Sequence, residues 1–330
     1  MNTTTPVLLA LDIGARKHAF ASEHDGRRTV GTVANDPQQL RAFLKDLMRP
    51  NGTLQVLMEA TGIYYLDVAL IAEELGAQVS VINPRTAHNF AKALGQRSKT
   101  DALDAVMLLD FLKRMPFTPW QAPAKPLLEL RHYGRYLVQL TEESTAARNR
   151  LHALSSTTSS PAFLRADLKR SIASLERRIE RIRAQAMALI KADEWLKMRL
   201  DALLTIIGVA EVSAIALLSE LAALPSSLSG RACVSHAGLD PRLHESGTSV
   251  HKPVRISRHG NKYLRRALFH PAMAAARHDP MAAAFRQRLL DKGKKKLQAV
   301  VAIMRKLLTA AWALVRNPAT YKPEKLYAGA

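Results

Sequence analysis

The chain has 330 residues, of which 48% are hydrophobic, so it is long enough for two domains with apolar cores. Lys and Arg number 48 against 28 Asp and Glu, and the net charge of +20 favours a polyanionic partner, most simply nucleic acid. An anionic membrane surface is the alternative partner, although no uninterrupted apolar run is long enough to cross a bilayer. The single cysteine, Cys233, excludes an internal disulfide and does not suggest a cysteine-based zinc site.

The first residues, Met-Asn-Thr-Thr-Thr-Pro, place no basic residue ahead of the short apolar stretch, so no signal peptide is predicted. We therefore expect a soluble, cytoplasmic protein without a membrane partner. The charge is uneven, because 16 Lys and Arg but only two acids lie between His251 and Arg316. The C-terminal part is the expected phosphate-binding region.

The first 120 residues alternate between strand-like and helix-like patterns. Apolar or alternating runs predict strands over 7–13, 17–22, 29–34, 54–58 and 78–82, and helical periodicity follows Asp36-Pro37 and covers 64–75, 86–94 and 101–112. Asp25-Gly26, between the second and third strands, is a strong hairpin signal. A three-strand meander followed by βα units is the element order of the ribonuclease H-like fold, so we predict an α/β domain of this class.

Four acids occupy special places in this order. Asp12 and Glu59 end the first and fourth strands, and Asp101 and Asp104 begin the last helix, where their spacing puts both on one helix face. In the predicted fold these three elements bring their acids together. Carboxylates in such places are costly unless they are neutralised, and three or four of them suffice to hold Mg²⁺, or Mn²⁺ in its place, for phosphoryl chemistry.

Each acid alone also has an ordinary explanation. Asp12 could begin a turn before Gly14, Asp101 could be a charge favoured by the helix macrodipole, and Asp104 could be a surface acid. The Asp-Ile-Gly of residues 12–14 also opens the phosphate loop of sugar kinases and actin-like ATPases. That alternative is disfavoured because the 15 glycines do not cluster into a nucleoside site.

The middle of the chain carries two heptad patterns, over 130–154 and 168–189, separated by a polar loop at 155–161. These patterns predict a helical hairpin of coiled-coil type that needs a partner surface. The partner could be the hairpin's own two helices or a second copy of the chain, in which case the hairpin would be a dimerisation arm.

The C-terminal part is predicted to be mainly helical. Residues 204–210 resemble the turn of a helix-hairpin-helix, with Ala210 where a second glycine is usual, so this turn would meet either phosphate or a neighbouring helix. A loop-rich stretch follows over 238–250. It contains Ser246, which could attack a phosphodiester if arginines stabilised the added charge. A Ser-Gly pair is more often a simple turn, and the candidate bases are His244, Asp240 and a metal-bound hydroxide.

Motifs along nearly the whole chain resemble one family, the insertion-sequence transposases that join a RuvC-like DEDD domain to a C-terminal serine transposase domain. The family is that of the bridge-RNA-guided recombinases. The motifs are Leu11-Asp-Ile-Gly, Met58-Glu-Ala-Thr-Gly, Val81-Ile-Asn-Pro, Lys99-Thr-Asp-Ala-Leu-Asp-Ala, Ala237-Gly-Leu-Asp-Pro-Arg, Glu245-Ser-Gly-Thr-Ser-Val, Ile256-Ser-Arg-His-Gly-Asn, Leu264-Arg-Arg-Ala-Leu and Pro271-Ala-Met.

The resemblance implies that Asp12, Glu59, Asp101 and Asp104 are the metal-binding DEDD acids and that Ser246 is the nucleophile. It implies site-specific DNA cleavage, strand exchange and religation through a 5′-phosphoserine, guided by a structured non-coding bridge RNA that pairs with donor and target DNA. A homodimer that assembles into a tetramer, acting at the nucleoid of a prokaryote, is the expected state. The expected nucleic-acid contacts are Arg242, Lys252, Arg255, Arg258, Lys262, Arg265 and Arg266.

Two places depart from the family pattern: His251-Lys252-Pro253 replaces the usual Arg-Gly, and Ala210 replaces a glycine. The predicted domains are a RuvC-like domain over 1–120, a coiled-coil hairpin over 121–198 and a basic serine transposase domain over 199–330. Two other functions stay open. One is a RuvC-like metal-dependent nuclease or Holliday-junction resolvase in which Ser246 is structural, and the other is a nucleic-acid-binding protein without chemistry.

Overall fold

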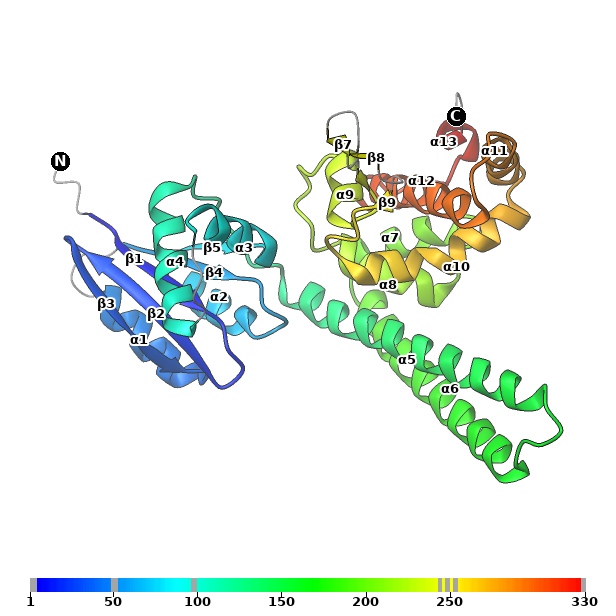
Figure 1. Cartoon of the computed structure of the whole chain (residues 1–330), viewed down its shortest axis with the longest axis horizontal. Coiled ribbons are helices and arrows are strands. Elements are labelled where there is room, and N and C mark those ends of the chain that lie inside the picture. Colours follow the sequence, from blue (N-terminus) through cyan, green and yellow to red (C-terminus); the bar gives the residue numbers. More distant parts are fainter. Residues whose placement is uncertain are drawn as a thin grey trace. The chain divides into compact units, whose positions relative to one another are not determined.

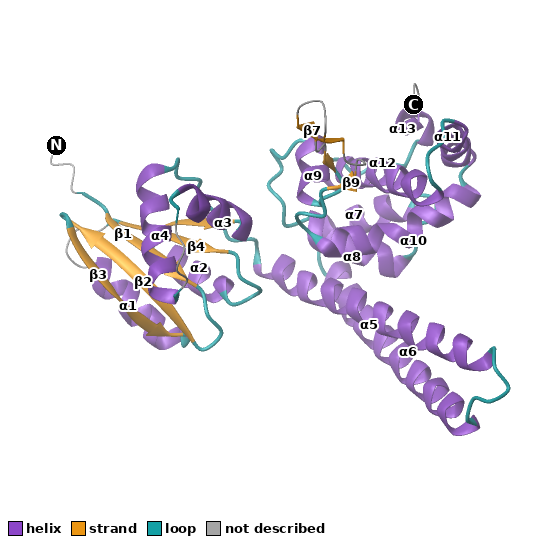
Figure 2. Cartoon of the chain, in the orientation of Figure 1, coloured by secondary structure: helices purple, strands orange, loops and turns teal. Residues whose placement is uncertain are grey.

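The structure is a computed structural model that describes residues 5–48, 53–95, 100–242, 245–246, 250–251 and 255–327. The chain divides into two units, Met1–Ala122 and Pro123–Ala330. The five-stranded sheet lies in the first unit, whereas the second unit is built mostly of helices (Figures 1 and 2). The predicted mixed α/β domain and mainly helical C-terminal part are confirmed, while the division at residue 198 stays a prediction.

The first unit is built on one mixed sheet with the strand order β3-β2-β1-β4-β5. The first three strands are antiparallel, and β4 and β5 run parallel to β1. Asp25 and Gly26 both have positive φ, +47° and +76°, as a tight hairpin turn between β2 and β3 requires. The strands are β1 (Val7–Asp12), β2 (Lys17–His24), β3 (Arg27–Ala34), β4 (Leu54–Glu59) and β5 (Gln78–Ile82).

Helices cover both faces of this sheet. Leucines of β1 pack with α1 and α2 on one face, and alanines of β1 and β2 pack with α3 and α4 on the other. Small side chains at Ala10, Ala19 and Ala21 leave room for α4 to approach the sheet closely. The helices are α1 (Pro37–Met48), α2 (Tyr65–Glu74), α3 (Pro84–Ala93) and α4 (Asp101–Arg114), in the predicted order.

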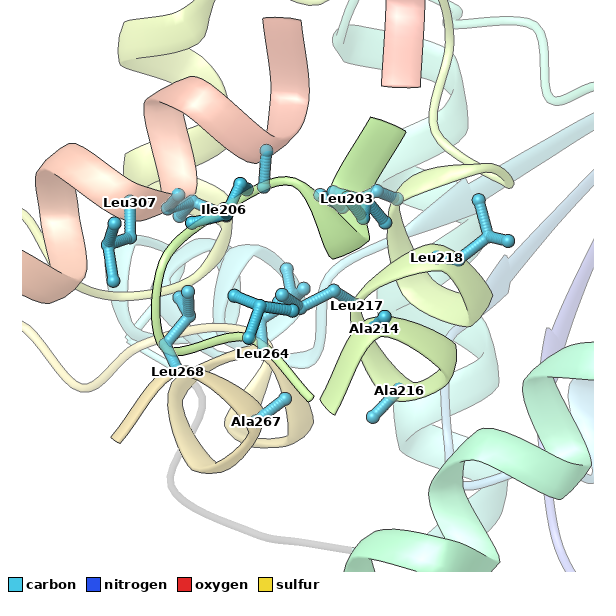
Figure 3. Close-up of a cluster of buried hydrophobic side chains, with 14 of the residues drawn as sticks. Leu203, Ile206, Ala214, Ala216, Leu217, Leu218, Leu264, Ala267, Leu268 and Leu307 are labelled. Carbon is cyan, nitrogen blue, oxygen red and sulfur yellow. The ribbon is translucent and has the colours of Figure 1, made fainter. Parts of the chain in front are cut away.

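The second unit has its own hydrophobic core. Figure 3 shows part of it, where Leu203 and Ile206 lie with Leu217, Leu264 and Leu307 from neighbouring helices. The helices are α5 (Lys125–Ser155), α6 (Ala162–Lys191), α7 (Glu194–Leu204), α8 (Glu211–Leu221), α9 (Gly230–His236), α10 (Lys262–His278), α11 (Pro280–Asp291), α12 (Lys296–Arg316) and α13 (Pro323–Tyr327).

Among the described residues, α12 alone is long and apolar enough to cross a membrane by length and composition. Half of its most apolar stretch is buried inside the unit, and Ile303, Leu307 and Leu308 belong to the hydrophobic core. Burial of this kind is what the central helix of a helical core shows, so α12 gives no indication of a membrane span.

The two heptad patterns form α5 and α6, which pack side by side (Figure 1). Leu140, Ala147 and Leu175 are buried between them, and α5 also packs against α8. The two helices of one chain therefore supply each other's partner surface. Their supercoiling and a role in dimerisation stay predictions.

The turn at 204–210 is a corner between α7 and α8. Gly208 has a φ of +93°, and a Cβ there would lie 2.6 Å from the carbonyl oxygen of Pro271 in α10. The glycine is therefore required by close packing of this turn on α10, and the structure favours the helix–helix corner over a phosphate-binding turn.

Candidate active site and nucleic-acid interface

Asp12 and Glu59 lie side by side at the carboxyl ends of two neighbouring parallel strands. Leu11 is paired with Met58, and one further step along the same register places Asp12 beside Glu59. Neighbouring strands are about 4.8 Å apart, so the two backbones hold these acids close together. Because side chains alternate, both acids share the face of Ala10 and Leu57, which α3 and α4 cover.

Two ion pairs fix the direction in which α4 crosses this face. Near its C-terminus, Asp110 accepts a hydrogen bond from Arg28 (3.3 Å) and Lys113 pairs with Glu23 (2.5 Å). Glu23 lies opposite Leu8, at the start of β1. The C-terminal half of α4 is thus near the beginning of β1, so its first turn points towards the end of β1, where Asp12 lies.

That first turn carries the other two acids. The Thr100 hydroxyl accepts a hydrogen bond from the backbone N–H of Leu103 (3.2 Å) and caps the helix. Asp104 is half-buried and one turn before the buried Leu108, so it faces the sheet, whereas Asp101 is exposed. The positive end of the helix macrodipole favours negative charge here. We call Asp12, Glu59 and the first turn of α4 the acidic edge.

The acidic edge offers only oxygen donors from carboxylates, the ligand chemistry that Mg²⁺ and Mn²⁺ prefer. The four predicted acids therefore come from the three elements that the sequence indicated. Among the described residues, however, no three acid, histidine or cysteine side chains are grouped closely enough to hold a metal ion. The fold places the acids at one edge of the sheet, but no three of them lie close enough together to form a metal-binding cluster.

Ser246 lies in a β-hairpin of the second unit. Ser246 of β7 (Glu245–Ser246) is paired with Val250 of β8 (Val250–His251). An outer ladder pairs β6 (Pro241–Arg242) with β9 (Arg255–Ile256). The sequence predicted only a loop here, because two-residue strands are too short to show alternation. We call the four strands β6, β7, β8 and β9 the serine hairpin.

Two arginines face each other across the outer ladder. Arg242 is the cross-strand partner of Arg255, and both are exposed. Like charges directly opposite are destabilising unless an anion lies between or beside them. Four residues span at most about 14 Å, so Ser246 is within that reach of Arg242.

The base of the serine hairpin is held by hydrogen bonds that join residues 236–238 to residues 258–265. Arg258 N–H donates to the Gly238 carbonyl (3.1 Å), Asn261 N–H to the His236 carbonyl (2.7 Å) and Arg265 Nη1 to the Ala237 carbonyl (2.8 Å). The 237–242 and 256–261 motifs are therefore the two sides of one frame.

Glu220 is a functional candidate that the sequence did not single out. It is 2% exposed and accepts hydrogen bonds from Arg135 Nε (2.5 Å) and Nη2 (3.1 Å), and from Asn261 Nδ2 (2.6 Å). Asn261 also caps α10 through the N–H groups of Tyr263 and Leu264. Glu220 thus ties α5 to the frame of the serine hairpin. In the sequence, the only sign of this role was that an acid, Glu220, lies near the end of the apolar stretch of α8.

The other predicted nucleic-acid contacts divide into groups. Arg258, Lys262, Arg265 and Arg266 line one groove of about 760 Å³. Lys252 lies outside the described residues. Of the candidate bases, His244 also lies outside them, and Asp240 accepts a hydrogen bond from the Ser257 hydroxyl (2.6 Å).

Two family models match the chain. A transposase model named for the DEDD domain of IS110 matches residues 9–158, and the model of the IS116/IS110/IS902 transposase family matches residues 200–287. The pilin gene-inverting protein of Moraxella lacunata is 34% identical over 273 residues, 80% of this chain and 81% of that protein. The probable family 20 transposase of Pseudomonas aeruginosa is 27% identical over 319 residues, 87% of this chain and 91% of that protein.

These matches define the chain as a transposase, an enzyme class that recombines DNA. This chain belongs to the IS110 family of transposases. Among solved structures, the chain is similar to RuvC of Thermus thermophilus, with 18% identity, 36% of this chain and 84% of that chain covered, and a TM-score of 0.22.

Proposed function

We propose that the chain is an RNA-guided DNA recombinase in which Ser246 forms a 5′-phosphoserine with DNA and Asp12, Glu59, Asp101 and Asp104 hold Mg²⁺. The observation that carries the metal site is the acidic edge, where two strand ends and one helix start converge. Mg²⁺, or Mn²⁺ in its place, would neutralise charge on the scissile phosphate when bound there.

The serine step conserves the energy of the phosphodiester. Ser246 Oγ attacks the phosphorus, a serine–phosphorus ester forms and the bond to the 3′ oxygen breaks. The base that takes the serine proton returns a proton to the 3′ oxygen, which leaves as a hydroxyl. The proton of the serine passes to a base, for which His244 and Asp240 are the candidates of this chain. Arg242 and Arg255 stabilise the charge that the phosphate gains. A 3′-hydroxyl of another strand reverses the step and releases the serine.

Choice of sequence is delegated to a structured bridge RNA that pairs with donor and target DNA. The protein then reads mostly backbone and shape, in keeping with its exposed cations and its net charge of +20. The working form is a homodimer that assembles into a tetramer. The relatives named for pilin gene inversion support recombination as the outcome, since an inversion requires cut ends to be rejoined.

The test compares the wild-type chain with Ser246→Ala on end-labelled DNA, in the presence of the RNA transcribed beside the gene. Wild type should give a covalent protein–DNA adduct on a denaturing gel, and Ser246→Ala should lose the adduct and the recombinants while it still binds DNA. Recombination by Ser246→Ala would contradict the proposal. Cleavage by Ser246→Ala that leaves free 5′-phosphates would instead favour a RuvC-like nuclease or junction resolvase.

A further inference from the structure

A groove of about 760 Å³ lies in the second unit between α5, α8, α10 and α12. The described residues that line it include neither Ser246 nor any of the four acids. At one place it adjoins the serine hairpin, through Ile256 and Arg258, and at another it reaches the start of α12, through Leu297. We call it the α10 groove.

One wall of the α10 groove is cationic. Arg258, Lys262, Arg265 and Arg266 line it, and Glu142, paired with Arg266, is the one acid among its described lining residues. Burial and the charges of Arg258 and Arg266 lower the pKa of Arg265, which shows that these cations crowd one another. An anion along this wall would relieve the repulsion. Lys294, Lys295 and Lys296, just before Leu297, add further positive charge by sequence.

The opposite wall, on α5, carries the one lining acid, Glu142, whose charge is paired with Arg266. The hydroxyls of Thr141 and Thr145 donate to carbonyls of their own helix, at 2.7 and 2.9 Å, so they are already satisfied. The floor is apolar and includes Val138 and Met304. Leu297 stands at the rim with 60% of its surface exposed. The groove therefore offers charge on one side and apolar contact below.

We infer that the α10 groove binds a short unpaired nucleic-acid strand, with its phosphates along the cations of α10 and its bases against the apolar floor. Bases in a single strand present free faces that pack on side chains. A duplex keeps these faces in its own stack, so it would contact the cations but leave Leu297 in water. The inference rests on the nucleic-acid binding in the proposed function and is independent of the reaction at Ser246.

The test measures fluorescence anisotropy of the full-length chain with three labelled probes: a short uridine homopolymer, a thymidine homopolymer of equal length and a duplex. Leu297→Asn should weaken binding of the single strands about fivefold or more and leave duplex binding unchanged, because only an apolar contact is lost. Lys262→Ala should lower the slope of log affinity against log salt by about 0.7 for the single strands. The homopolymer that binds more tightly identifies the strand as RNA or DNA.

Arg277→Ala is the matched control, because Arg277 is an exposed cation of the same helix that does not line the groove. It should change neither the affinity nor the slope by as much as Lys262→Ala, and thermal unfolding should confirm that the variants are folded. Unchanged single-strand binding by Leu297→Asn, or an equal loss with the duplex, would overturn the inference. Since Ser246→Ala should bind all probes normally, failure of the serine chemistry would leave this result intact.

Discussion

At the scale of single residues, two glycines allow the close backbone contacts at the base of the serine hairpin. Gly260 has a φ of +123°, and a Cβ there would lie 2.1 Å from the carbonyl oxygen of His236. Gly238 has a φ of +65°, and its Cβ would lie 2.6 Å from the carbonyl oxygen of His259. Any side chain at either position would force two backbone segments apart, so the frame depends on both glycines.

Gly260→Ala should therefore lower the free energy of unfolding by about 2–4 kcal/mol, from the strained backbone and the clash together. It should also slow adduct formation more than it weakens DNA binding, because the hairpin is displaced. Urea unfolding checks the first effect. Gly293→Ala is the control: its φ is also positive, +75°, but no atom lies within 4 Å of the added Cβ. An equal loss of stability in both variants would contradict the role of close packing.

A buried histidine makes the stability of the first unit depend on pH. His18 is fully buried, burial lowers its pKa below the usual 6.5, and its Nδ1 accepts a hydrogen bond from the Gly14 N–H (3.3 Å). Because the unfolded chain takes up the proton first, the stabilisation is complete above about pH 6.5 and is lost as the pH falls towards the lower, folded-state pKa. His18→Gln should flatten this decline in urea titrations between about pH 5 and 7. His88→Gln, at an exposed site, should not.

At the scale of elements, the direction of α4 is the feature on which the proposed metal site depends. Its two ends carry different acids: Asp104 at the acidic edge and Asp110 in a hydrogen bond with Arg28. If the first turn supplies a ligand, only the acid at that end contributes to metal affinity. The two positions form a matched pair on one helix.

Asp104→Asn should weaken Mn²⁺ binding, measured by calorimetry on the full-length chain, by about tenfold or more, because a charged oxygen ligand becomes neutral. Asp110→Asn should leave the affinity within about twofold. Equal affinities for the two variants would rule out a contribution from Asp104. The same Asp104→Asn variant should form less covalent adduct at a fixed Mg²⁺ concentration.

One buried carboxylate, Glu220 of α8, joins this helix to α5 and to the N-cap of α10. Glu220→Gln removes a 2% exposed carboxylate charge that is paired with Arg135, and should lower the free energy of unfolding by about 2–3 kcal/mol. Glu142→Gln is the control, because Glu142 also pairs with an arginine but is 43% exposed, so its loss should cost less than about 1 kcal/mol. Urea unfolding measures both. Similar losses would show that burial of Glu220 is energetically unimportant.

Local patterns predicted the elements of the first unit well, and distant contacts explain what was missed. The strand from 54 to 58 and the hairpin at Asp25-Gly26 are set by short-range alternation and turn chemistry, and both are present. The ladders around Ser246 are only two residues long, and the partners of Glu220 are 85 and 41 residues away. Sequence periodicity reveals neither strand pairings as short as these ladders nor contacts between residues so far apart in the chain.

At the scale of the whole molecule, the proposed chemistry is divided between two units with separate cores. The predicted metal acids belong to the first unit, and Ser246 and the α10 groove belong to the second. The sequence identified the acids and Ser246 because each lies in a short motif that can be recognised without knowledge of the fold. The element order also predicted that the acids would come together, but it could not give the strand register or the direction of α4 that determines where each acid lies.

Ser246 is proposed to become covalently bound to DNA, and the bonded residue can be identified directly. After reaction and nuclease digestion, trypsin should release the peptide 243–255, because Lys252 precedes a proline and resists cleavage. Tandem mass spectrometry of this peptide distinguishes Ser246 from Thr248 and Ser249. We expect a phosphate or nucleotide on Ser246, absent when the chain is incubated without DNA. Modification at Thr248 or Ser249, or an unmodified peptide together with fully cleaved DNA, would contradict the account.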